Sequence, residues 1–326
     1  MFWRKKRAPS GPPQIGCFGK LPATGDFIRL NAGGEELAAF DRWLGDGIDF
    51  ARRSMAQTFE PAYQGSVGLF IFHGDGQNGE PPNRALVGAW APSGDNAGRL
   101  YPMTVFASYD YAQLVSAGGG VPIALFPLLA AAYELVRTGR SLPVDAFLDR
   151  VSRIQTPSLE DPDLVTQGYR SWLATQPMKA LWETGFGTEA NRFWVVQNVL
   201  ASVQPFRGQE LPRTGLAMRL PLGAGDAYAA AVWLDMTLRL AKWKSTLLNA
   251  FWSPQQSLLI HLGSPHVASF RELISPTGQA DHVADLCGPA TLDEGMTRRA
   301  LGPQLDALVA RTDLSLAQFL EGLGNV

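Results

Sequence analysis

The stretch that decides the fold is Val67-Gly68-Leu69-Phe70-Ile71-Phe72, a short apolar run followed by polar residues 73–83. Two similar runs follow it, Ala85-Leu86-Val87-Gly88-Ala89-Trp90 and Met103-Thr104-Val105-Phe106-Ala107. Each run is bounded by Gly, Pro, Asn or Asp, which is typical of β-strands. The sequence therefore predicts a sheet in the N-terminal half, and a long hairpin connection between its first two strands.

Amphipathic helices and one more strand are predicted around these runs. Residues 35–59 repeat apolar side chains at spacings of three and four, which indicates one buried helix face. Gly45 and Gly47 weaken the middle of this helix, so a kink or break is expected there, and Pro61 is expected to end it. Further segments that we predict are a strand over 15–21 and helices over 121–137 and 144–154.

The C-terminal half repeats the order of strands and helices. Helices are predicted over 164–174, 189–203, 227–243, 266–274 and 305–311, and strands over 214–220 and 257–262. Residues 155–163 are rich in proline and acid and form a candidate boundary. We therefore expect α/β layers in two packed lobes. The predicted divisions are a flexible basic tail over 1–14, an α/β domain over 15–155, and an α/β lobe with an expanded helical region over 156–326.

Composition excludes several classes of protein. The 326 residues are 46% hydrophobic and 18% charged, which is enough apolar content for a large core. With 28 Lys and Arg against 30 Asp and Glu, the net charge of −2 gives no basic footprint, so no nucleic-acid partner is expected. The only cysteines, Cys17 and Cys287, form no disulfide framework, which favours a reducing compartment.

Neither export nor membrane insertion is expected. Residues 1–7 are basic like the start of a signal peptide, but Pro, Gly and Ser follow in place of an apolar segment. The most apolar stretch, Val121–Val136, is 16 residues long and contains two prolines and Glu134. A membrane-spanning helix needs about 20 apolar residues. We therefore expect a soluble chain with no stable membrane insertion.

Local motifs for catalysis or cofactor binding are weak. Residues 16–20 have only two residues between their glycines, whereas a phosphate-binding loop needs four. Asp75-Gly76 is similar to metal loops of some phosphatases, but Asp-Gly is also the usual composition of tight turns. A loose set of possible metal ligands occurs later in the chain: His261, His266, Asp281, His282, Asp285 and Cys287. Scattered surface residues are the simpler interpretation, so no catalytic residue, metal or cofactor is expected.

Two segments place polar residues with specific backbone preferences beside predicted strands. The first is Gly16-Cys17-Phe18-Gly19-Lys20-Leu21-Pro22-Ala23-Thr24-Gly25-Asp26-Phe27. The second is Ala91-Pro92-Ser93-Gly94-Asp95-Asn96-Ala97-Gly98-Arg99-Leu100-Tyr101-Pro102-Met103-Thr104. With Phe40-Asp41-Arg42-Trp43-Leu44 between them, these segments resemble the TagF (ImpM) family of accessory proteins of bacterial type VI secretion. Residues 251–253 and 257–260 give a weaker third match, and residues 155–245 look expanded relative to the family.

The resemblance implies a fold and a function. The implied fold is an α/β sandwich with helices on both faces of a mixed sheet. The implied function is post-translational repression of the secretion machine in the cytoplasm, without catalysis. The implied partner is the forkhead-associated scaffold protein of the type VI secretion system.

The polar residues of the two segments are the candidate site. They are Lys20, Thr24, Asp26, Asp95, Asn96, Arg99 and Tyr101. Two cations and two anions among them, at the ends of predicted strands, are expected either to brace the loops against one another or to contact a partner.

Two alternatives to a binding protein stay open. One is a metal-dependent phosphatase or other hydrolase, based on Asp75-Gly76 and the 261–287 set. The other is a structural component of the secretion apparatus that docks on the membrane through residues 2–7.

Overall fold

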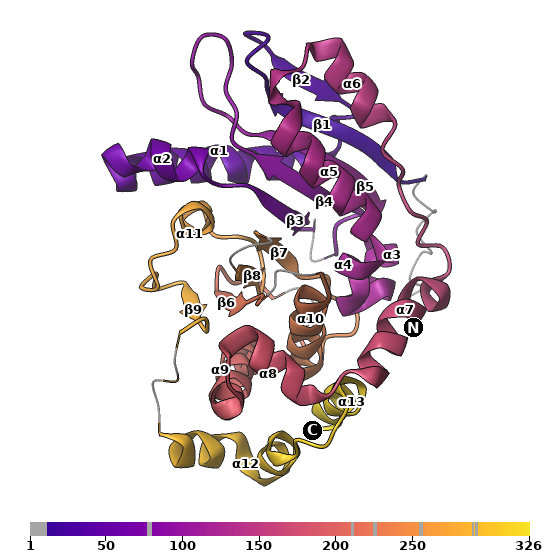
Figure 1. The fold of residues 1–326 in the computed structure, drawn as a ribbon, viewed down its shortest axis with the longest axis vertical. Helices are drawn as coiled ribbons and strands as arrows, with labels where there is room; N and C mark the ends of the chain where they lie inside the picture. The colour runs from indigo at the N-terminus through magenta and orange to yellow at the C-terminus, as the bar shows by residue number, and fades with distance from the viewer. Residues whose placement is uncertain are drawn as a thin grey trace.

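A computed structural model of the chain describes residues 12–76, 80–209, 212–223, 227–253, 257–288, 290 and 293–326. These residues form one nine-stranded sheet in the order β2-β1-β5-β4-β3-β7-β8-β6-β9 (Figure 1). Neighbouring strands are antiparallel except β6 and β9, which are parallel, so the sheet is mixed. The strands are β1 (Gln14–Lys20), β2 (Phe27–Leu30), β3 (Gly68–Phe72), β4 (Arg84–Ala91), β5 (Met103–Asp110), β6 (Ala217–Pro221), β7 (Asn249–Trp252), β8 (Ser257–His261) and β9 (Val283–Asp285).

Helices account for most of the remaining regular structure. The α-helices are α1 (Glu35–Met55), α2 (Phe59–Gln64), α3 (Tyr111–Ala117), α4 (Val121–Ala124), α5 (Phe126–Thr138), α6 (Val144–Ser152), α7 (Pro162–Thr175), α8 (Met178–Phe186), α9 (Arg192–Val203), α10 (Ala227–Ala241), α11 (Ser269–Ile274), α12 (Glu294–Ala310) and α13 (Leu316–Asn325). Short 3-10 turns are η1 (Ala56–Thr58), η2 (Gly118–Gly120), η3 (Gly139–Ser141), η4 (Glu189–Asn191) and η5 (Gln204–Phe206).

Helices cover both faces of the sheet. Side chains alternate along each strand, so each strand contributes to two separate cores. On β3, Leu69 and Ile71 join the larger core, of aliphatic and aromatic side chains, with α5, α10 and neighbouring helices. Phe70 and Phe72 join an aromatic core with α1, α2 and α11 on the opposite face. The predicted α/β sandwich with helices on both faces is therefore confirmed.

The sheet continues from one half of the chain into the other. β7 pairs with β3, so strands from beyond residue 245 extend the N-terminal sheet directly. Figure 1 shows α5 and α6 over the upper strands, while α8, α9, α10, α12 and α13 gather at the lower end. Of the boundary expected at residues 155–163, residues 155–161 form an irregular connection before α7, and its role as a domain limit stays a prediction.

The predicted kink in the first long helix is wrong. α1 runs through Gly45 and Gly47 without a break, and it ends at Met55, before Ala56 adopts a positive φ of 48°. A Cβ atom at position 47 would lie 2.7 Å from the Cβ of Phe270, so glycine allows α11 to approach α1 closely. Pro61 lies inside the first turn of α2, where it does not interrupt helical hydrogen bonding.

Other predicted elements changed in extent. The helix predicted over 121–137 is divided at Leu125 into α4 and α5, each with a proline near its start. β1 begins at Gln14, one residue before the predicted strand. Among the described residues, no single helix has the length and apolar character needed to cross a membrane, although the bent pair Tyr111–Ala124 and Phe126–Ser141 passes that test by length and composition.

Candidate functional site

The two motif segments meet at one end of β1. Gly19 has a φ of 146°, and a Cβ there would lie 2.2 Å from the carbonyl oxygen of Pro102, so the two segments can only approach this closely at a glycine. Gly94 and Leu100 form a β-bridge that closes the tip of the second segment. The N–H of Asn96 donates to the carbonyl of Thr24 at 3.2 Å, which joins the tips of both segments.

A buried carboxylate holds this junction together. Asp95 forms an ion pair with Lys20, and both side chains are almost fully buried. Its Oδ2 also accepts from Nε of Arg99 at 2.7 Å, and its Oδ1 accepts from the backbone N–H groups of Ala97 and Arg99 at 3.0 and 2.9 Å. Hydrogen bonding to Lys20, followed by that to Arg99 and Ala97, keeps the pKa of Asp95 well below its usual value, so the carboxylate is ionised.

The ion pair is continued by hydrogen bonds to the surrounding backbone. Ser93 Oγ donates to the carbonyl of Lys20 at 2.7 Å, and Nη2 of Arg99 donates to the carbonyl of Gly25 at 2.8 Å. The Arg99 side chain is nevertheless 66% exposed, because only one edge of its guanidinium faces the protein. The junction thus presents a charged group to solvent on a backbone that the buried carboxylate braces.

An aromatic group lies beside the ion pair. Phe27 stacks on Phe18 with ring centroids 5.2 Å apart, and its edge contacts Tyr101 at 5.0 Å. The Nζ of Lys20 lies 4.6 Å from the centroid of the Phe27 ring, a cation–π contact. Tyr101 donates its hydroxyl to Asp41 on α1, and burial together with this hydrogen bond raises the pKa of Tyr101.

The candidate residues are therefore only partly assembled. Lys20, Asp95 and Arg99 share one network, while Thr24 and Asn96 meet through the backbone and Tyr101 is bonded to α1. Asp26 is exposed and forms no ion pair within the described part of the chain; only its N–H contacts Thr24 Oγ1, at 3.3 Å. One anion holds both cations, whereas two cation–anion pairs were expected. Contact with a partner stays a prediction.

The residues considered for a metal site do not form one in the described part of the chain. Nowhere in it do three or more His, Cys, Asp or Glu side chains take an arrangement that could hold a metal ion. Asp285 pairs with Arg219 and accepts from the N–H of Cys287 at 3.0 Å. In the Asp-Gly loop, Asp75 accepts from the hydroxyl of Ser264, and residues 77–79 lie outside the described residues.

Histidines from this set nevertheless lie close together around β8. The rings of His266 and His282 have centroids 4.6 Å apart. His261 is completely buried edge-on to Phe251, and neither of its ring nitrogens has a hydrogen-bond partner among the described residues. Burial, with smaller contributions from His282 and His266, lowers the pKa of His261 to about 3. The native protein therefore keeps this imidazole neutral at pH 5.

We expect the free energy of unfolding to fall on acidification because of His261. The unfolded chain binds a proton near pH 6.5, whereas the native chain does so only near pH 3. Stability is therefore lost as the pH drops below 6.5, by about 2 kcal/mol between pH 7 and pH 5 for this group. In urea titrations at both pH values, His261→Phe should remove about this much of the difference. An equal pH difference in wild type and variant would contradict the assignment.

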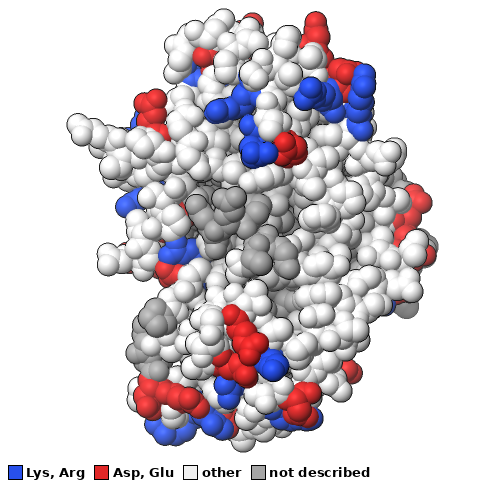
Figure 2. All heavy atoms as spheres, viewed as in Figure 1, with Lys and Arg blue, Asp and Glu red and all other residues white. Residues whose placement is uncertain are grey.

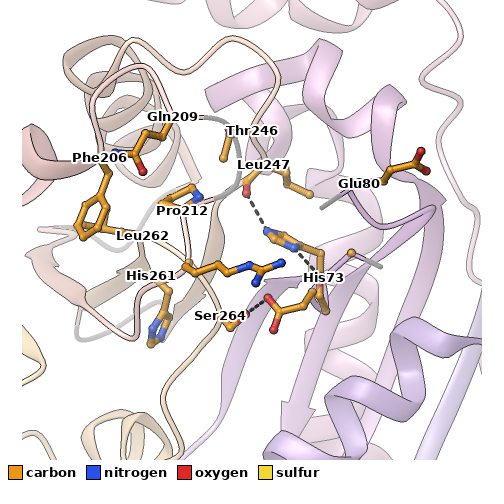
Figure 3. Close-up of a pocket in the computed structure, with 15 residues that line it drawn as sticks. His73, Glu80, Phe206, Gln209, Pro212, Thr246, Leu247, His261, Leu262 and Ser264 are labelled. Atoms are coloured by element: carbon orange, nitrogen blue, oxygen red, sulfur yellow. Dashed lines mark hydrogen bonds between the residues drawn. The ribbon is translucent and has the colours of Figure 1, made fainter. Parts of the chain in front are cut away.

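A cavity of about 450 Å³ lies where the two halves of the sheet join, and its lining includes Asp75, Gly76 and His261 from the segments considered for a hydrolase. Its charged lining residues have both signs: Asp75, Glu80 and Arg213. Figure 3 shows His73 and Leu247 on its wall, joined by a hydrogen bond, while the ring of His261 points away from His73. The described residues of its lining are 73–76, 80, 206, 209, 212–213, 246–247 and 261–264, which only the folded sheet brings together.

A buried polar network forms one wall of this cavity. The His73 ring nitrogens lie 3.0 Å from the carbonyl of Gly74 and 2.8 Å from that of Leu247. The backbone N–H of His73 donates to Oδ1 of Asn249 at 2.7 Å, and Asn249 Nδ2 donates to the carbonyl of Gly263 at 3.1 Å. Burial lowers the pKa of His73. These bonds join the end of β3 to β7 and to the loop after β8, so the network stabilises the junction of the halves.

Comparison with known proteins identifies the domain that carries the junction. Residues 16–154, which contain both meeting segments, match a family model of a type VI secretion system-associated domain. The family is that of the TagF N-terminal domain, so the chain carries a TagF N-terminal domain. The match includes the three segments within residues 16–104 on which the resemblance mainly rests.

The comparisons with solved structures and with curated proteins do not extend this domain assignment. A crystal structure of PA0076 from Pseudomonas aeruginosa PAO1 is similar with a TM-score of 0.47 and 17% sequence identity, over 82% of this chain and 96% of that chain. A search of curated proteins found no match.

Proposed function

We propose that the protein represses type VI secretion after translation by binding the forkhead-associated scaffold protein of the system in the cytoplasm. The TagF N-terminal domain supports the link to this secretion system. The observation that favours a binding role is the braced junction, in which a buried Asp95 carboxylate fixes a loop tip that exposes Arg99 and Asn96. A rigid loop with an exposed arginine loses little conformational entropy when a partner binds.

Arg99 is a better probe of partner contact than Asp95. Removal of the buried Asp95 carboxylate would disturb the junction itself, whereas the Arg99 side chain is mostly exposed. We expect Arg99→Glu to weaken binding of the purified scaffold protein at least tenfold, which corresponds to about 1.4 kcal/mol. In cells, the same variant should release secretion from repression.

The matched control is Arg137→Glu on α5. Arg137 is similarly exposed and pairs with Glu134 within its own helix, so the substitution makes the same charge change outside the junction. Calorimetric titration of the scaffold protein with each variant provides the comparison. Equal weakening by both substitutions would indicate only long-range electrostatics. Full-strength binding by a folded Arg99→Glu variant would exclude this face, and absence of binding by the wild-type chain would refute the proposed partner.

A further inference from the structure

β2 forms the outer edge of the sheet beside the braced junction. β2 is the last strand of the sheet, and among the described residues no strand pairs with its outer side. Its sequence, Phe27-Ile28-Arg29-Leu30, contains no proline, and its register with β1 is unbroken. Backbone N–H and C=O groups along such an edge can pair with an added strand.

An aromatic side chain is held rigidly on this edge. Phe27 is 37% exposed although it is an apolar residue of the sheet. Its ring is fixed between Phe18, Tyr101 and the ammonium group of Lys20. Exposed aromatic residues that are already ordered are frequent anchors of protein interfaces, because they bury much apolar area at low entropic cost.

Arginine side chains flank this aromatic anchor. Arg29 is exposed, and its guanidinium lies 5.2 Å from the centroid of the Phe18 ring. Arg99 reaches the turn before β2 through its bond to the carbonyl of Gly25. The charge of Lys20 is neutralised by Asp95, and Asp26 is the exposed anion on this turn. Arg29 and Arg99 are thus the exposed cations beside Phe27, while Asp41 lies behind Tyr101 and accepts its hydroxyl.

We propose that β2 is the docking edge for an extended acidic segment of the partner protein. The segment would pair with the β2 backbone, place an apolar side chain on Phe27, and place carboxylates against Arg29 and Arg99. Phe27 and Arg29 lie two residues apart on one face of the strand, so alternate residues of the added strand would meet them. This inference rests on the proposed function, since the scaffold protein supplies the segment.

Hydrogen exchange with and without the purified scaffold protein tests the edge directly. We expect amides within residues 27–30 to become at least tenfold more protected when the scaffold protein is bound. Arg29→Glu and Phe27→Ser should each weaken binding at least tenfold, whereas Arg29→Lys, which keeps the charge, should bind nearly as well as wild type. Binding should also weaken as salt is raised.

Two substitutions elsewhere provide matched controls. Phe126 on α5 is 54% exposed, so Phe126→Ser removes an exposed ring without touching β2. Arg137→Glu makes the same charge change as Arg29→Glu. Both controls should bind like wild type. Thermal unfolding of every variant shows whether a loss of binding reflects loss of folding, and Arg29→Glu alone decides the result if Phe27→Ser unfolds.

The outcomes separate this inference from the proposed function. If wild type binds the scaffold protein while exchange at 27–30 and binding by both β2 variants stay unchanged, the edge is not the site and the function stands. Concentration-dependent protection of 27–30 without the scaffold protein would assign the edge to a second copy of the chain and overturn the inference. Absence of wild-type binding would count against both.

Discussion

Replacing Phe251 by alanine is expected to reduce the free energy of unfolding by about 3–5 kcal/mol. Phe251 is buried on β7, where it pairs in register with Phe70 of β3. Its ring stacks on Trp43 of α1 with centroids 4.6 Å apart. The substitution therefore opens a cavity at the point where strands from the two halves of the chain meet, and the loss should affect both halves.

Urea denaturation followed by tryptophan fluorescence and by circular dichroism gives the measurement. The control is Phe126→Ala, which removes a ring of the same size from an exposed position and should change stability by about 0.5 kcal/mol or less. A loss below about 1 kcal/mol at Phe251 would mean that the β3–β7 junction contributes little to folding.

Replacing Asp95 by alanine is expected to be the most damaging change in the loop junction. It removes the acceptor of two cations and of two backbone N–H groups at once. Lys20 would then remain buried without its counter-ion, which is strongly unfavourable. Lys20→Met leaves the carboxylate with Arg99 and the backbone, so this variant should lose about 3 kcal/mol, and Asp95→Ala should lose more.

Arg99→Ala completes the comparison, because its side chain is mostly exposed. Its loss should be at most about 1 kcal/mol. The expected order of destabilisation is Asp95→Ala, then Lys20→Met, then Arg99→Ala, measured by urea denaturation at neutral pH. A reversed order, with Arg99→Ala the worst, would mean that the buried Lys20–Asp95 pair is not what braces the junction.

Local patterns predicted many elements correctly. The apolar runs at 67–72, 85–90 and 103–107 correspond to β3, β4 and β5, because short apolar runs bounded by turn residues carry a local strand signal. Elements without such a pattern were missed, among them β2, α3, α8, β9 and α13. α13 did carry a local signal, since Ser315 and Gln318 form a capping box at its start.

The glycines of α1 show why propensity alone was misleading. Gly45 and Gly47 lower the helix propensity of that segment, yet the helix is unbroken. Close packing of α11 against Gly47 compensates through contacts with residues more than 200 positions away. A sequence window contains no information on such a distant contact.

The candidate site was also only partly predictable from the sequence. The residue types and spacing of the two motif segments indicated a family and a set of charged loop residues. They did not indicate that Asp95 would take both Lys20 and Arg99 and leave Asp26 outside the network. That choice depends on the approach of Gly19 to Pro102, which sets where the strand ends and loop tips meet.

The sequence by itself determined the strands and helices that carry their own periodicity, and the loop chemistry that marks a TagF N-terminal domain. Only the tertiary structure decided which carboxylate is buried, that β7 joins β3, and that β2 ends the sheet with an aromatic ring exposed. The physical reason is the distance along the sequence over which each kind of interaction acts. Turn and helix preferences act over a few residues, whereas burial, ion pairing and strand order depend on groups that are neighbours only after the chain has folded.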